Sequence, residues 1–189
     1  MPAAQQDHSR WSQYYQANKD FSLITRETLS FVLNKANLQR KRFAVDLGSG
    51  TGQLTRELFH RGFQRITGVD ISDVAVQLAQ ESTVFPELKY IEYNLEEDFE
   101  RLFSEKADFI ITKYVLAFID DCPSFLERVK KILSEEASFI IISPSLKYQP
   151  EKKHDITIDS KVTQELLKDH FRTVKYFEYA RDDIFVCKN

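Results

Sequence analysis

Short apolar runs alternate along this chain with longer segments in which apolar residues recur at helical spacing. Five of these runs have the length of a β-strand: 43–47, 65–70, 88–94, 107–115 and 138–143. The intervening segments 53–61, 73–82 and 124–133 carry their apolar residues on one helical face. Alternation of strands with helices of about ten residues predicts βαβ units and a parallel sheet.

The end of the chain departs from this alternation. A helical segment, 160–171, precedes two strand-like runs, 173–180 and 183–189, that only Arg181 and Asp182 connect. A parallel crossover needs about a dozen residues or more, so these two strands should pair antiparallel. We therefore expect an α/β fold, a three-layer α/β/α sandwich with a mostly parallel sheet and one reversed strand near an edge.

Three residues mark where individual helices should begin or end. The Ser72 hydroxyl can accept an unpaired backbone N–H at the start of the helix that follows it. Pro123 has a fixed φ that suits a first helical turn, and Gly62 suits the position just after a helix. These local signals agree with the alternation of apolar runs.

The charge of the chain narrows the choice of partners. Hydrophobic residues make up 42% and charged residues 29% of the 189 residues, and the formal net charge is -3. That balance gives no general attraction to phosphate backbones or anionic lipid, so a nucleic-acid partner is not favoured. The amino terminus lacks the apolar core of a signal peptide, and no apolar run reaches the length of about 18 residues needed to span a membrane. We expect a cytoplasmic protein that does not bind membranes.

The two cysteines, Cys122 and Cys187, lie far apart in the sequence. Their spacing matches no metal-binding motif, so we expect small buried apolar side chains and no metal site.

Candidate chemistry lies in the segment "FAVDLGSGTGQLTREL", where Gly48, Gly50 and Gly52 follow a strand and precede a helix. In such sheets ligands bind at the carboxyl ends of the strands, and glycines let the backbone approach them closely. A tight turn without a ligand is the alternative. Asp70 ends the next strand about 20 residues later, where a carboxylate can accept hydrogen bonds from both hydroxyls of a ribose.

Two details separate the nucleotides that such a loop could hold. The dinucleotide fingerprint is G-x-G-x-x-G, whereas the spacing here is G-x-G-x-G and Gln53 holds the place of the third glycine. Asp46 lies on the strand two residues before Gly48, where a buried anion would repel a pyrophosphate. The same anion suits the cationic amino-acid end of S-adenosylmethionine.

With "VDLGSGTG", "GVDIS" and "ADFIITKYVLAFIDD", the chain from Phe43 to its end resembles the class I S-adenosylmethionine-dependent methyltransferases. This resemblance implies a Rossmann-like seven-stranded sheet of order 3-2-1-4-5-7-6, with the reversed strand of the closing hairpin inserted between strands five and six. It also implies a single methyltransferase domain, 1–189, with an N-terminal helical cover over residues 1–42 and a core over residues 43–189.

The resemblance also implies which residues bind the cofactor, S-adenosyl-L-methionine. These residues would contact the methionine part, the ribose hydroxyls or the adenine ring of the cofactor, or lie near its sulfonium. They are Asp46, Gly48, Ser49, Gly50, Gly52, Asp70, Ile71, Ser72, Asn94, Leu95 and Lys113. Asn94 departs from the acidic residue that many members carry, although its amide oxygen still accepts a hydrogen bond. A lysine beside a cation is unusual, so the Lys113 ammonium should point away or toward Asp46 or Asp120.

Methyl transfer from a sulfonium is a direct displacement that needs chiefly alignment and exclusion of water. A general base is needed only where the nucleophile must first lose a proton, and we assign no catalytic residue. Tyr14 and Tyr15 lie in "WSQYYQANKDF", which resembles a segment that folds over the cofactor in this family. Tyr114 and His154 complete the candidates for acceptor binding. For Tyr14 and Tyr15 the alternative is that they only pack a terminal helix, and for His154 the alternative is an ordinary surface position.

We therefore expect a methyltransferase that acts on an O or N atom of a small molecule, because little of the chain lies outside the core fold. Methylation of a protein or RNA is the alternative within the class. A nicotinamide-dependent oxidoreductase and a catalytically silent cofactor-binding protein are alternatives from other classes. We make no prediction of the oligomeric state.

Overall fold

The computed structural model describes residues 3–17 and 22–189 of the chain, with the side chains of residues 9–17, 22–151 and 155–189. Helices and strands follow one another as α1 (Ala3–Gln16), α2 (Arg26–Ala36), β1 (Phe43–Leu47), α3 (Gln53–His60), β2 (Arg65–Asp70), α4 (Asp73–Glu81), β3 (Leu88–Glu92), β4 (Ala107–Lys113), α5 (Cys122–Ile132), β5 (Leu133–Pro144), α6 (Ser160–His170), β6 (Thr173–Tyr179) and β7 (Asp182–Lys188). Short 3-10 turns lie between them at η1 (Phe99–Leu102), η2 (Leu116–Phe118), η3 (Leu146–Tyr148) and η4 (Glu151–Ile156).

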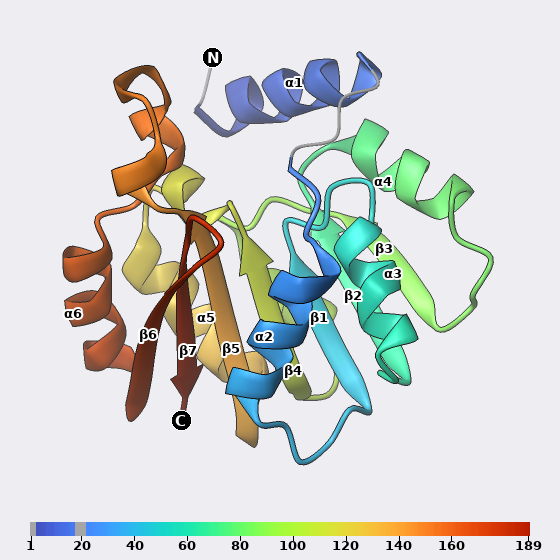
Figure 1. The fold of residues 1–189 in the computed structure, drawn as a ribbon. Helices are drawn as coiled ribbons and strands as arrows, with labels where there is room; N and C mark the ends of the chain where they lie inside the picture. Colours follow the sequence, from blue (N-terminus) through green and yellow to red (C-terminus); the bar gives the residue numbers. More distant parts are fainter. Residues whose placement is uncertain (1–2, 18–21) are drawn as a thin grey trace.

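The strands form one seven-stranded sheet in the order β3-β2-β1-β4-β5-β7-β6. β7 runs antiparallel to both β5 and β6, whereas the other neighbouring strands pair parallel. In Figure 1 the arrow of β7 points opposite to its neighbours. The predicted fold class and strand order are confirmed.

The strand predicted over residues 138–143 is longer in the structure. α5 ends at Ile132 and β5 begins directly at Leu133, which pairs with Ala107 before the register with β4 shifts. Exposed residues at 135 and 136 interrupt the apolar pattern there, so the apolar run alone marked only the buried half of the strand.

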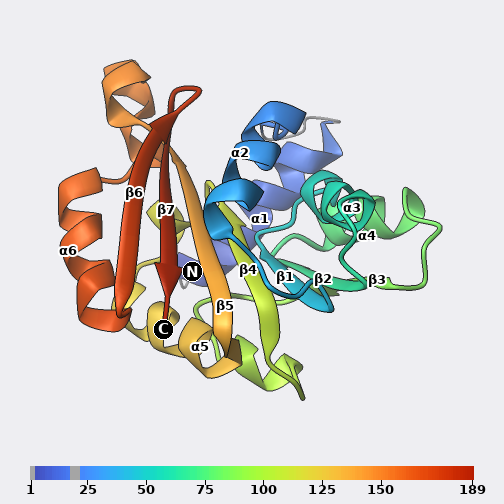
Figure 2. The same ribbon diagram turned by 60° about the horizontal axis from the view of Figure 1, so that its bottom comes forward.

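Helices cover both faces of the sheet and bury two separate apolar cores. Side chains alternate between the faces along each strand, and β1 shows this directly: Ala44 packs with α2, α3 and α4, whereas Val45 and Leu47 pack with α5 and α6. Figures 1 and 2 show these helix layers on opposite sides of the strands. Asp46 therefore faces the α3 side, near the carboxyl end of its strand.

The N-terminal helices have different places. α1 lies across the carboxyl edge of the sheet (Figure 1), and α2 packs on one face against β5 and β7. The expected cover over residues 1–42 stays a prediction; within it, α2 belongs to a helix layer of the sandwich.

The local signals act as the sequence indicated. The Ser72 hydroxyl accepts from the backbone N–H of Ala75 at the start of α4, and Pro123 lies in the first turn of α5. Gly62 follows the end of α3 with φ +89°.

Both cysteine thiols are free; Cys187 is buried and Cys122 half-buried. Among the described residues, no helix is long and apolar enough to cross a membrane.

The turn between β6 and β7 holds two non-glycine residues in the left-handed region. Ala180 has φ 52° and Arg181 has φ 72°. A two-residue hairpin turn of this kind needs positive φ at both positions and normally uses Asn and Gly. Each residue with a Cβ is strained there by about 1–2 kcal/mol.

We expect Arg181→Gly to raise the free energy of unfolding by about 0.5–1 kcal/mol, because relief of strain outweighs the added freedom of the unfolded chain. Chemical denaturation would measure the change. The matched control is Arg181→Ala, which removes the guanidinium but keeps the Cβ and should leave stability nearly unchanged. Equal stability of the two variants would contradict the assignment of strain.

Candidate functional site

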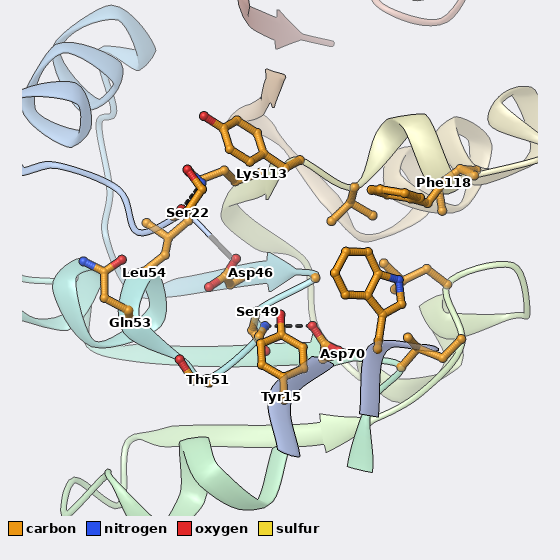
Figure 3. Close-up of a pocket in the computed structure, with 18 of the residues that line it drawn as sticks. Tyr15, Ser22, Asp46, Ser49, Thr51, Gln53, Leu54, Asp70, Lys113 and Phe118 are labelled. Carbon is orange, nitrogen blue, oxygen red and sulfur yellow. Dashed lines mark hydrogen bonds between the residues drawn. The ribbon is translucent and has the colours of Figure 1, made fainter. Parts of the chain in front are cut away.

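A cavity of about 340 Å³ lies at the carboxyl edge of the sheet, where the loop after β1 meets the ends of β2 and β4. The N-terminal segment adds residues of α1 and of the strap, residues 22–24, to its lining; Figure 3 labels Tyr15 and Ser22 among them. Nine of the eleven residues predicted to bind the cofactor line this cavity: Asp46, Gly48, Ser49, Gly50, Asp70, Ile71, Asn94, Leu95 and Lys113. The structure thus brings together residues that four strand ends supply.

The other two predicted residues, Gly52 and Ser72, lie behind the cavity wall. Gly52 precedes α3 with φ +77°, and a Cβ there would lie 2.6 Å from the Tyr90 ring. Ser72 is fully buried, and its hydroxyl caps α4. Both residues shape the two loops that border the cavity.

Close packing explains the glycines in the loop itself. Gly48 has φ +81°, and a Cβ there would lie 2.1 Å from a methyl group of Val115. A Cβ at Gly50 would lie 2.8 Å from the Tyr15 hydroxyl. The loop therefore lies directly against β4's continuation on one side and against α1 on the other.

Asp46 is a buried carboxylate, one oxygen of which has no hydrogen-bond partner among the described residues. It is 1% exposed; its Oδ2 accepts from the Thr55 hydroxyl at 2.7 Å, and its Oδ1 has no hydrogen-bond partner among the described residues. Burial raises the pKa of Asp46 to about 7, although the bond from Thr55 opposes this. A cationic donor in the cavity would satisfy Oδ1 and favour the ionised form. The nearby Ser49 hydroxyl is likewise buried without a partner among these residues.

Asp70 fixes the glycine loop. Its Oδ2 accepts from the Gly50 backbone N–H at 2.7 Å and its Oδ1 from the Ser72 N–H at 3.0 Å. Burial raises its pKa, while these N–H groups favour the ionised form. Each carboxylate oxygen has a second lone pair, so Asp70 retains capacity to accept bonds from a ligand in the cavity that it lines.

Gln53, which stands where a dinucleotide site needs its third glycine, holds the strap. Its amide nitrogen donates to the Ile24 carbonyl and its amide oxygen accepts from the Ile24 N–H, both at 3.2 Å. This reciprocal pair ties the strap to the first residue of α3. The side chain that departs from the dinucleotide pattern thus builds a wall of the cavity.

Lys113 approaches the strap from the end of β4. Its ammonium donates to the Ser22 carbonyl and lies 3.5 Å from the centre of the Tyr114 ring. Burial lowers the pKa of Lys113 to about 8, and the carboxylates of Asp182 and Asp46 oppose this shift. We expected this ammonium to point away or toward Asp46 or Asp120; its hydrogen bond goes to the strap, and Asp46 acts on it by charge.

The four residues predicted to bind the acceptor have different surroundings. Tyr15 and Tyr114 line the cavity, and the Tyr114 hydroxyl donates to Asp182 at 2.6 Å. Tyr14 packs edge-on against Trp11 and Tyr15 and is not part of the cavity lining. His154 lies in η4, outside the residues whose side chains the structure describes.

Polar and aromatic contacts hold α1 over the cavity. The Ser12 hydroxyl donates to Asp73 at 2.7 Å and lies 3.1 Å from the Ser72 hydroxyl. On the other side the Trp11 ring meets the Phe118 ring edge-on, with 5.2 Å between centroids. α1 is thereby attached to α4 and to η2, on two sides of the cavity.

Sequence reasoning missed much of the upper wall. Residues 22–24 and 115–119 supply apolar lining that we did not predict: Leu23, Ile24, Val115, Phe118 and Ile119. The last three lie in the family-like segment "ADFIITKYVLAFIDD", whereas no motif marks Leu23 and Ile24. The aromatic residues of "WSQYYQ" were a usable signal for Trp11, whereas the strap lies in a segment without periodicity.

Comparisons with known proteins agree on one family. A family model described as a methyltransferase domain matches residues 40–181. No curated protein matches the chain at a significant level. Many solved structures share the fold.

An O-methyltransferase family protein from Burkholderia thailandensis is similar, with a TM-score of 0.70 and 13% identity over 87% of this chain and 56% of its own length. A TehB-like SAM-dependent methyltransferase from Corynebacterium glutamicum has a TM-score of 0.66 and 17% identity over 98% of this chain and 97% of its own. DhpI, in a complex with SAM and HEP, has a TM-score of 0.69 and 16% identity over 98% of this chain and 96% of its own.

We expect Asp46→Asn to stabilise the ligand-free protein at pH 8 by on the order of 2–4 kcal/mol. The folded state holds the Asp46 proton up to about pH 7, whereas the ordinary value is 3.8. The cost of ionising Asp46 therefore grows as the pH rises between these values and is fully present above pH 7. Asparagine removes that cost and keeps an acceptor for Thr55.

Chemical denaturation at pH 4 and pH 8 would measure this effect. The exposed carboxylate of Asp120 also lines the cavity, so Asp120→Asn is the matched control and should change stability by less than about 0.5 kcal/mol. An Asp46→Asn variant that is no more stable than wild type at pH 8 would contradict the raised pKa.

Proposed function

The chain belongs to the class I S-adenosylmethionine-dependent methyltransferases, and from this premise we propose that it methylates an oxygen or nitrogen atom of a small molecule. The enzyme uses S-adenosylmethionine as its cofactor, which supplies a methyl group on a sulfonium. What we propose beyond the family is the set of residues that bind it and the kind of acceptor.

We propose that the cofactor's methionine part lies along the loop of Gly48 and Gly50, with its amino group at Asp46. The observation that supports this is the Oδ1 of Asp46, which is buried without a hydrogen-bond partner among the described residues, on a side chain that lines the cavity. Asp70 would then accept from the ribose hydroxyls, as it already accepts from the Gly50 and Ser72 N–H groups. Ile71 and Leu95 line the same cavity and offer apolar surface to the adenine ring.

One observation carries the proposal of a small acceptor: α1 roofs the cavity instead of leaving an open platform. Trp11, Tyr15 and the strap all belong to the cavity lining, and α1 is attached on two sides. A roof excludes water from the reacting atoms, as this reaction needs. It also limits the acceptor to a molecule that fits beneath a helix.

Charge supports the same conclusion. The cavity lining contains the carboxylates of Asp46, Asp70, Glu96 and Asp120, and Lys113 is its only basic residue among those described. Such a lining offers little to a phosphate backbone. The family match sets aside the nicotinamide-dependent oxidoreductase considered from sequence.

A panel of metabolites read by release of S-adenosylhomocysteine tests the proposal directly. We expect turnover with at least one hydroxyl or amino compound and no labelled methyl transfer to proteins or RNA of a lysate. Labelling of macromolecules without turnover of any small molecule would favour the protein or RNA alternative instead.

Asp70→Ala should weaken binding of S-adenosylhomocysteine by about 1–3 kcal/mol, the scale of lost hydrogen bonds to a charged group. Titration calorimetry would measure it. Asp159→Ala, at the start of α6 and outside the cavity lining, is the control and should bind as wild type does. Unchanged affinity in Asp70→Ala would show that the ribose lies elsewhere.

Cofactor binding should depend on pH through Asp46. A cationic amino group favours the ionised carboxylate, so we expect affinity to fall up to about tenfold per unit as the pH drops below about 7. Binding at pH 6 should release a proton, visible as a dependence of the calorimetric heat on the buffer's ionisation enthalpy. Asp46→Asn should bind weakly and lose this proton release; a variant that keeps it would place the coupled proton on another group.

A further inference from the structure

Lys113 is the one basic side chain among the described residues that line a cavity with four carboxylates. Building on the proposed function, we propose that Lys113 is the general base that takes the proton of the acceptor, and that the acceptor is an acidic hydroxyl compound of the phenol or enol class. This assigns the lysine to the acceptor, not to the cofactor as its sequence position suggested.

The register of the sheet places Lys113 beside the expected position of the reacting atoms. Asp46 pairs with Ile111 across β1 and β4, and Lys113 lies two residues further on the same face. Lys113 pairs in turn with Ile142 of β5 at the carboxyl edge. The amine and the carboxylate that would bind the cofactor's amino group are therefore diagonal neighbours on one face.

Tyr114 holds this arrangement through an unusual backbone conformation. It has φ 61°, in the left-handed region, while its N–H donates to the Ile142 carbonyl at 2.8 Å. Its hydroxyl donates to Asp182, at the start of β7. Strained residues of this kind are concentrated at functional sites, and here the strain fixes the end of the strand that carries Lys113.

The groups that face the amine come from two strands, the residue after β4 and the strap. Asp46 of β1 and Asp182 of β7 act on it by charge, and the Tyr114 ring lies beside it. The Ser22 carbonyl accepts a hydrogen bond from it (Figure 3). Burial lowers the pKa of Lys113 to about 8 against the pull of both carboxylates. A cationic amino group bound at Asp46 would neutralise the negative charge of that carboxylate. Cofactor binding should therefore lower the pKa of Lys113 further and favour its uncharged amine.

The proton and electron balance of the step follows from this. The amine of Lys113 takes the proton from the acceptor hydroxyl and becomes an ammonium. The oxygen uses its freed electron pair to form the new bond to the methyl carbon, and the electron pair of the broken carbon–sulfur bond stays on sulfur. The ammonium later returns its proton to water, which restores the amine.

Acidity and shape select the class of acceptor. A base of pKa about 8 can take the proton of a phenol, which ionises near about 10, but an aliphatic alcohol is far too weak an acid. A neutral amine needs no base before it attacks. Trp11 and Phe118 contribute aromatic surface to the cavity lining, against which a planar ring can pack.

The decisive variants are Lys113→Arg and Lys113→Gln. Arginine keeps the charge and the donor to the Ser22 carbonyl but does not deprotonate, so a structural role would survive in it and a basic role would not. With phenol as acceptor we expect both variants to lose kcat/KM about a hundredfold or more, while S-adenosylhomocysteine binding stays within a few-fold of wild type.

The pH profile adds a second readout. Wild-type kcat/KM should rise about tenfold per unit up to the lysine pKa, at or below about 8, and then level off. Full activity in Lys113→Arg would overturn the proposal, as would methylation of anilines in place of phenols.

A binding measurement separates this proposal from the proposed function. Para-nitrophenol absorbs visible light only as its phenolate, so a titration with S-adenosylhomocysteine present reports formation of an ammonium–phenolate pair at Lys113 without turnover. We expect the phenolate band to appear on binding at a pH below the phenol's own pKa, and to be absent with Lys113→Gln. Binding as the neutral phenol, equal spectra in both proteins, or no binding would each overturn the role of Lys113, whatever the acceptor panel shows.

Discussion

The arrangement of the site depends on one constraint: a carboxylate is buried at the end of β1 with one oxygen left without a partner. Asp46 faces α3 because strand alternation puts Val45 and Leu47 on the opposite face. Ionising such a group in a folded interior is costly, and burial raises its pKa to about 7. A cationic ligand removes that cost, so a residue that destabilises the empty protein favours the bound one. Functional sites commonly lower the stability of the ligand-free protein in this way, because their groups are placed to suit a ligand.

The N-terminal segment completes the cavity through contacts that are specific to its side chains. Gln53 holds the strap from α3 and Lys113 holds it from β4, so two elements of the core fix the chain between α1 and α2. α1 is then attached to α4 through Ser12 and to η2 through Trp11. α1 and the strap are therefore attached to the same loops that would bind the cofactor, so their packing and cofactor binding should influence each other.

The sequence predicted the fold, and it predicted together nine residues that line one cavity. Apolar period, helix caps and the short β6–β7 connection are local and indicated the fold class, whereas the strand order came from the family resemblance. The glycine loop and Asp70 are also local signals at strand ends. The position of Asp182 beside Lys113 was not predicted, because it depends on the residue register of β7 against β5, which the strand order alone does not give. The strap lacks periodicity, and the family-like segment that contains η2 does not reveal which of its side chains line the cavity.

A crystal structure of the protein with bound S-adenosylmethionine tests the central claim most directly. The account predicts the nucleoside in the cavity beneath α1, with its amino group within hydrogen-bond distance of Asp46 Oδ1 and its ribose at Asp70. Electron density for the nucleoside outside this cavity, or within it but with the amino group directed away from Asp46, would contradict the account.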